Sequence, residues 1–186
     1  MTLALRSPRR WSVADYLSFE ETASERHEFI DGVIYAMVGG SDRHNLITGN
    51  LFLALGNHLP DRCQAFEHGM KLRVVLDRAE CFYYPDVMVS CSEQDRARHW
   101  RERPLLIAEV LSDSTERNDR AEKFTAYKSI PELQEYVLIA QDVPQVEVFR
   151  RRNAWQLETF FMNDTITLES VALTLPVTQL YRRIAF

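Results

Sequence analysis

Two acidic residues stand inside apolar runs that are typical of buried β-strands, and they constrain the fold more than any other feature. Asp86 precedes the run Val87-Met88-Val89, and Glu109 interrupts the run 105–111. A carboxylate in such a run is costly to bury unless opposite charge or hydrogen bonds compensate it. If the two strands are neighbours, one register places both carboxylates at the same point, where two such ligands could hold a divalent metal ion. The chain therefore predicts a metal site supported by a sheet.

Each acid also has a simpler interpretation. Asp86 could face solvent at the start of its strand or accept hydrogen bonds from backbone N–H groups. Glu109 could form a buried ion pair with an arginine or a lysine. The residues alone leave these alternatives open.

A lysine follows on the predicted helix behind these strands. Lys123 lies four residues after Asp119 and four before Tyr127, so the three share one helix face. The simpler hypothesis is an i,i+4 ion pair, worth about 0.3–0.5 kcal/mol. The functional hypothesis directs the ammonium into the metal site, where it would orient the attacking water and stabilise charge on a phosphate. Tyr127 is interpreted as a packing residue.

Several further residues are candidates for the site, although each alone is weaker evidence for a function. Glu28 could be a third acid near the metal, or a solvated edge glutamate. His44, in the first turn of a predicted helix, could contact a phosphate or act as an acid or base, or could be a surface residue. Arg96, Arg98 and Arg101 lie in a basic loop that could bind nucleic-acid phosphates, or could simply be solvated.

Size and composition narrow the class of protein. The 186 residues suffice for a single domain, which we expect to span 1–186 with 1–10 as a loose arm. The net charge of −5 argues against a protein that coats nucleic acid indiscriminately, but it allows a local basic patch. No apolar run approaches the roughly 20 residues of a bilayer span. The three cysteines, Cys63, Cys81 and Cys91, form no CxxC pair, which favours unpaired thiols in a reducing compartment and a cytoplasmic protein.

Periodicity and turn signals predict a mixed α/β domain with one central sheet flanked by helices. The clearest signals are the capping box at Ser12, the break at Gly39-Gly40-Ser41-Asp42 that offers a helix N-cap, and the Asp31-Gly32 hairpin turn. The predicted elements are a helix from Ser12 to about Phe19, a hairpin over 27–37, a helix over 43–59, strands within 63–76 around a bend at His68-Gly69, strands at 82–90 and 105–111, a helix ending near Ile130, and strands at 135–140, 145–151, 154–161 and 165–168.

Short motifs along the whole chain resemble the Uma-type family of restriction-endonuclease-like proteins, a branch of the PD-(D/E)xK nuclease superfamily. These motifs are Ser12 to Leu17, Arg26 to Gly32, Arg43-His44, Pro85-Asp86-Val87, Ala108 to Ser112, Asp119 to Tyr127, and Ile130 to Tyr136.

The resemblance implies a restriction-endonuclease-like fold with Asp86 and Glu109 as metal ligands. The superfamily lysine usually stands two residues after the second acid, where this chain has Leu111. In the family this lysine usually stands on the following helix, which matches Lys123. Glu28 matches an additional acidic residue of the family.

These observations lead us to expect a Mg²⁺- or Mn²⁺-dependent DNA endonuclease. Asp86, Glu109 and the Val110 carbonyl would bind the metal, Lys123 would position water, and Glu28 would assist. By analogy we expect a homodimer. One alternative is a catalytically inactive nucleic-acid-binding or interaction protein on the same scaffold. Another is a metal-dependent phosphodiesterase acting on RNA or a nucleotide.

Overall fold

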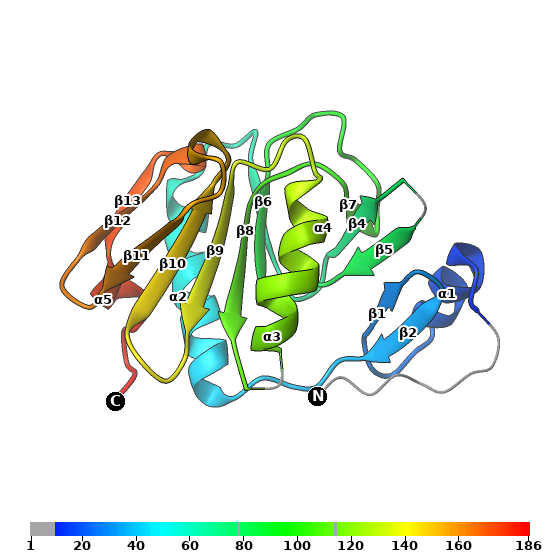
Figure 1. Cartoon of the computed structure of the whole chain (residues 1–186), viewed down its shortest axis with the longest axis horizontal. Coiled ribbons are helices and arrows are strands. Elements are labelled where there is room, and N and C mark those ends of the chain that lie inside the picture. The colour runs from blue at the N-terminus through cyan, green and yellow to red at the C-terminus, as the bar shows by residue number, and fades with distance from the viewer. Residues whose placement is uncertain (1–9, 78, 114) are drawn as a thin grey trace.

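The computed structural model of the chain describes residues 10–77, 79–113 and 115–186. Two mixed sheets lie side by side, and helices cover both faces of the larger sheet (Figure 1). The predicted mixed α/β class is confirmed, although the described strands divide among three sheets. The predicted arm falls mainly on residues 1–9, outside the described part.

The larger sheet has six strands and holds most of the core. Its strands are β3 (Gln64–Glu67), β6 (Val87–Ser90), β8 (Pro104–Leu111), β9 (Glu135–Ala140), β10 (Gln145–Arg150) and β11 (Leu157–Phe161). They lie in the order β11-β10-β9-β8-β6-β3, with β8 and β9 parallel and the other neighbours antiparallel. The central strands are almost continuously apolar because both of their faces are covered.

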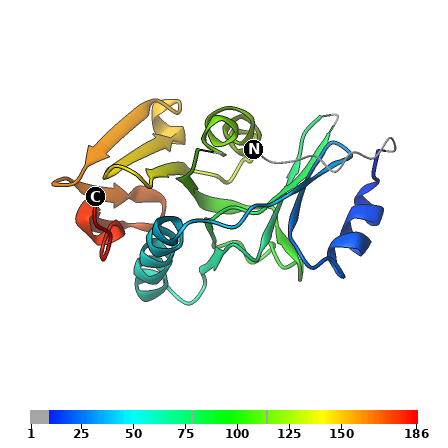
Figure 2. The same ribbon diagram turned by 90° about the horizontal axis from the view of Figure 1, so that it is seen from below.

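One face of this sheet is covered by α2 (Asp42–His58), and the other by α3 (Glu116–Asn118) and α4 (Phe124–Lys128). Figure 2 shows these helices on opposite sides of the strands. The Ser41 hydroxyl caps α2 by accepting from the His44 N–H at 3.1 Å, which confirms the predicted cap. Alternate residues of β8 face the two helical layers, and Glu109 shares the α4 side with Leu111.

The helical segment before β9 contains a π-turn that the sequence did not predict. The π-helix η1 (Asp119–Lys123) lies between α3 and α4, and its first and last residues are both buried. The Tyr136 hydroxyl, from β9, donates to the Asp119 carbonyl at 3.0 Å and so fixes the start of the turn. Such turns change the direction of the following side chains and are frequent at functional sites.

The smaller sheet has five strands: β1 (His27–Ile30), β2 (Val33–Ala36), β4 (Lys71–Val75), β5 (Glu80–Tyr83) and β7 (Trp100–Arg101). Their order is β2-β1-β5-β4-β7. The predicted hairpin is confirmed, because Asp31 and Gly32 both have positive φ, at 45° and 84°. Helix α1 (Val13–Glu20) packs on this sheet, with the Tyr16 ring stacked on Phe29 at 5.0 Å.

The prediction of one strand over 82–90 was wrong. The chain leaves β5 after Tyr83, passes through Tyr84-Pro85-Asp86 and enters β6 at Val87, in the other sheet. Pro85 has no N–H group for a ladder, which favours a break there. The bend after β3 carries the chain between the same two sheets, so His68 and Asp86 both lie where the sheets separate.

A two-stranded sheet closes the core beneath α2. It consists of β12 (Thr165–Leu168) and β13 (Leu173–Pro176), and β13 was not predicted. The remaining elements are the short helices η2 (Arg151–Asn153), η3 (Glu169–Val171) and α5 (Val177–Leu180). None of the helices in the described residues has the length and apolar character that a membrane span requires.

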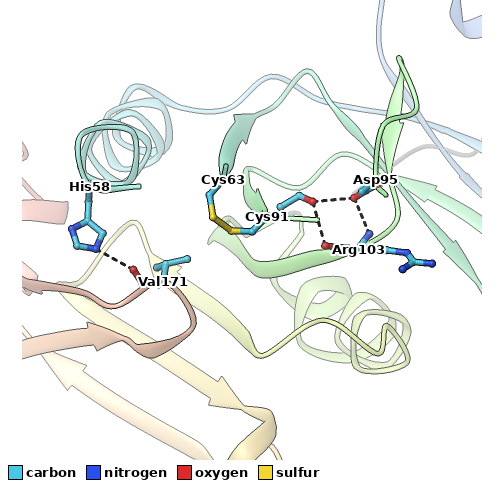
Figure 3. Close-up of a disulfide and its surroundings, with 7 residues drawn as sticks. His58, Cys63, Cys91, Asp95, Arg103 and Val171 are labelled. Carbon is cyan, nitrogen blue, oxygen red and sulfur yellow. Dashed lines mark hydrogen bonds between the residues drawn. A yellow bond between two sulfur atoms is a disulfide. The ribbon is translucent and has the colours of Figure 1, made fainter. Parts of the chain in front are cut away.

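A disulfide joins Cys63 and Cys91, which corrects the prediction of unpaired thiols for these two residues (Figure 3). In the antiparallel pair β3–β6, Gln64 lies opposite Ser90, so the next residues outward are the two cysteines. Their Cα atoms are 4.0 Å apart. The spacing of 28 residues resembles no known motif because strand pairing, and not local sequence, brings the cysteines together. Cys81 is buried and free.

Replacing both bonded cysteines, Cys63→Ser with Cys91→Ser, should lower the free energy of unfolding by roughly 2–4 kcal/mol, because the crosslink restricts the unfolded chain. Urea unfolding under oxidising conditions measures this loss. Reductant should shift the wild-type midpoint and leave that of the serine variant unchanged. Wild-type protein that titrates as three free thiols after oxidative purification would contradict the crosslink.

Candidate active site

The strand pair β6–β8 brings the two predicted acids together. Val87 lies opposite Ala108, which places Asp86 opposite Glu109. The Asp86 N–H donates to Glu109 Oε2 at 3.1 Å, and the Val110 N–H donates to Asp86 Oδ2 at 2.7 Å. The two carboxylates are thus held at one point by the backbone of each other's strand, as the assumed register required.

Lys123 enters the same point from the end of η1. Its ammonium lies 3.2 Å from Glu28 Oε1, 3.2 Å from Glu109 Oε1 and 3.3 Å from Asp119 Oδ1. The ion-pair hypothesis and the functional hypothesis for Lys123 are therefore compatible. Its ammonium forms the i,i+4 pair with Asp119 and also points toward the predicted site. Glu28 arrives from β1, so the smaller sheet contributes to the cluster as well.

This cluster carries more negative than positive charge. One ammonium faces three carboxylates, which gives −2 if all four groups are ionised. Burial raises the pKa of Glu109 well above its usual value, the Lys123 charge opposes that rise, and neighbouring acids add to it. Burial also raises the pKa of Asp119. Burial alone would lower the pKa of Lys123, but the surrounding carboxylates outweigh it and raise that pKa.

Asp86 has different neighbours from the Lys123 cluster. His44 Nε2, from α2, lies 3.1 Å from its Oδ2, and His68 Nδ1 lies 3.4 Å from its Oδ1. Burial would raise the pKa of Asp86, but the two imidazoles and the Val110 N–H outweigh that effect and lower it. His68 was not predicted, because only the β3–β6 register shows that it lies beside Asp86.

Tyr127 does more than pack. Its hydroxyl donates to Glu109 Oε1 at 2.9 Å. Burial, followed by the Glu109 charge, raises its pKa well above the usual value, which keeps the hydroxyl protonated as a donor. The helical spacing from Lys123 was visible in the sequence, but nothing there separated a hydrogen-bonded tyrosine from an apolar contact.

The Val110 side chain points into the core beneath α2. Its N–H faces Asp86, and in a strand the N–H and C=O of one residue point to the same side. The carbonyl therefore faces the β6 side of β8, where the predicted metal would lie. Its role as a ligand stays a prediction.

The basic loop begins at the other end of β6. Ser90 is four residues from Asp86, or roughly 13 Å along a strand. Arg96 and Arg98 are exposed, and their predicted phosphate contacts stay predictions. Arg101 is buried, donates to the Ala97 and Trp100 carbonyls and lies over the Phe66 ring. A phosphate contact does not fit this placement, so we do not assign one to Arg101.

The site chemistry fits a hard divalent cation. The converging donors are carboxylate oxygens, which Mg²⁺ and Mn²⁺ prefer, and the excess negative charge of the Lys123 cluster requires compensation. Every carboxylate oxygen of Asp86 and Glu109 also has a protein partner within 3.4 Å. An ion bound between them would replace or share some of these contacts.

Because one ammonium faces three carboxylates, loss of the lysine should destabilise the protein more than loss of one acid. Lys123→Met should lower the free energy of unfolding by about 3–5 kcal/mol, because it leaves buried carboxylates uncompensated. Asp119→Asn should change it by less than about 1 kcal/mol, since the ammonium retains Glu28 and Glu109. Urea unfolding of the metal-free protein measures both values. Lys128→Met is the matched control, because the Lys128 ammonium lies over the Phe124 ring and not among the carboxylates of the cluster. Equal losses for the two lysine variants would contradict the cluster.

Residues 13–178 match the family described as "Uma2: Putative restriction endonuclease". The chain is 35% identical over 179 residues to the uncharacterized Synechocystis protein slr1290, covering 94% of this chain and 93% of the relative. It is 40% identical over 144 residues to the uncharacterized Synechocystis protein sll1609, covering 75% and 80% of the two chains.

A crystal structure from Anabaena variabilis, described as a "putative nuclease belonging to DUF820", has a similar fold. The TM-score is 0.71 at 19% identity, over 90% of this chain and 96% of that one. This similarity confirms the fold, and the family match covers most of the chain, including the strands and helices that hold the site. The chain belongs to the Uma2 family, which is described as "Putative restriction endonuclease".

Proposed function

We propose that this chain is a Mg²⁺- or Mn²⁺-dependent DNA endonuclease that hydrolyses phosphodiester bonds. Family membership supports a nuclease. The metal requirement rests on one observation: Asp86 and Glu109 lie opposite each other, with the Lys123 ammonium 3.2 Å from Glu109. The family's description, "Putative restriction endonuclease", supports DNA as the substrate. Acids paired with an ammonium at one buried point suit the hydrolysis of a charged ester.

Each residue has a distinct role in this proposal. Asp86, Glu109 and the Val110 carbonyl would hold the ion, which when bound lowers the pKa of water and offsets charge on the phosphate. Lys123 would donate to the attacking water and to the phosphate oxygens. Glu28 and Asp119 hold its ammonium in place.

The substrate would approach across the border between the sheets. His44 lies beside Asp86 and could donate to a phosphate, and Arg96 and Arg98 could contact the backbone farther along the duplex. We further propose a homodimer, because two-fold pairing presents one site to each strand of a duplex.

One observation favours the inactive alternative as a second candidate. Each carboxylate oxygen of Asp86 and Glu109 has a protein partner within 3.4 Å, an arrangement that a purely structural network would also have. An inactive binding protein would keep these contacts and would bind Mn²⁺ no better than its Asp86→Asn variant. Isothermal titration of Mn²⁺ separates the two candidates, and a panel of DNA, RNA and small diesters separates a DNA nuclease from other phosphodiesterases.

Asp86→Asn and Glu109→Gln should each lower metal-dependent plasmid cleavage by on the order of 10²–10³ or more, because each removes a charged ligand of the ion that would offset charge on the reacting phosphate. Cleavage is measured with Mg²⁺ and with Mn²⁺, and circular dichroism checks the fold. Asp142→Asn, at an exposed position, removes an equal charge and should leave cleavage intact. Wild-type rates in the Asp86→Asn variant would refute the proposed function.

Tyr127→Phe removes only the hydroxyl that holds Glu109, so it should lower the cleavage rate about 10-fold to 100-fold and weaken Mn²⁺ binding, as loss of a ligand's hydrogen bond does. Tyr181→Phe is the matched control, because that hydroxyl donates to the Ala140 carbonyl away from the site. If both variants cleave equally well, the Tyr127 hydroxyl has no positioning role.

A further inference from the structure

Two imidazoles converge on Asp86 from elements that the Lys123 cluster does not use. His44 lies in the first turn of α2, on the sheet face opposite to α4, and His68 lies at the bend after β3. One ligand atom from each histidine and one from Asp86 all lie within 4.8 Å of one another. The roles proposed above give His44 only a phosphate contact and give His68 none.

The distances from the two histidine nitrogens to the Asp86 oxygens are close to those between neighbouring ligand atoms of a metal site. Around an ion with bonds of about 2.1 Å, neighbouring ligand atoms are roughly 3.0–3.5 Å apart. The two histidine nitrogens lie 3.1 Å and 3.4 Å from the nearest Asp86 oxygens. The two imidazole rings are stacked at an interplanar angle of 26°, with their centroids 5.8 Å apart.

The backbone holds both histidines in position. A Cβ on Gly40 would lie 2.7 Å from His44 Nδ1, so glycine is required for the ring to sit where it does. The His68 N–H donates to the Asp86 carbonyl at 3.3 Å, and the Arg26 guanidinium donates to the His68 carbonyl at 2.6 Å. The Cys63–Cys91 disulfide fixes the register of the same strand pair at its other end.

The donor set differs in chemistry from the cluster around Glu109. Two imidazole nitrogens and one carboxylate suit borderline ions such as Zn²⁺ and Co²⁺, whereas a set of oxygens alone suits Mg²⁺ and Mn²⁺. His44 Nδ1 is buried without a hydrogen-bond partner among the described atoms, which leaves Nε2 as the nitrogen directed at Asp86.

We propose that His44, His68 and Asp86 form a binding site for a borderline divalent ion of the Zn²⁺ and Co²⁺ class, beside the oxygen site and sharing Asp86 with it. Binding at this site requires no contact with Lys123 or Glu109. Ion binding by His44, His68 and Asp86 is therefore independent of whether the protein cuts DNA.

The test is a Co²⁺ titration without nucleic acid, followed by visible absorption. It is made in a Glu109→Gln background, which impairs the oxygen site. We expect one Co²⁺ to bind, and His44→Gln or His68→Gln to weaken binding by at least about tenfold. His58→Gln is the matched control, since His58 also lies on α2 but contacts the Val171 carbonyl (Figure 3). Equal affinity in all three histidine variants would overturn the proposal.

A second measurement needs no substitution and so does not depend on the variants folding. Cu²⁺ is added at one equivalent to the wild-type protein, and its electron paramagnetic resonance spectrum is recorded. We expect nitrogen hyperfine splitting from two imidazoles. A spectrum of oxygen ligands alone would show that this cluster does not bind such ions.

Discussion

The buried ammonium of Lys123 is the contact on which the structure depends most. It joins Glu28 of the smaller sheet, Glu109 of the larger sheet and Asp119 of η1. Buried ion pairs contribute little net stability compared with apolar packing, and an excess of acid makes this cluster more costly still. An arrangement that reduces stability at one point is typical of a functional site, where the missing positive charge comes from a ligand or a substrate-bound ion.

The fold explains how residues so far apart in the chain meet. The chain crosses between the two sheets at Tyr84-Pro85-Asp86 and again near His68, and the sheets separate at these crossings. Asp86 therefore has the Lys123 cluster on one side and two imidazoles on the other. This shared carboxylate connects the proposed oxygen site to the proposed histidine site.

The sequence was sufficient to predict those elements whose structure depends on residues close together in the chain. The Ser41 cap, the Asp31-Gly32 turn and the apolar strand around Glu109 all formed as expected. Pairing across the sheet was harder to foresee: the disulfide and the place of His68 depend on the β3–β6 register. The π-turn at Asp119–Lys123 was also missed, because its sequence is compatible with an ordinary helix.

The most direct test is a crystal structure of the protein soaked with Mn²⁺, with anomalous scattering used to locate the ion. We predict an anomalous peak in contact with carboxylate oxygens of both Asp86 and Glu109, with the Lys123 ammonium still beside Glu109. If Mn²⁺ binds only elsewhere and the two carboxylates keep all their protein contacts, the acids form a structural network and the proposed catalytic site is wrong.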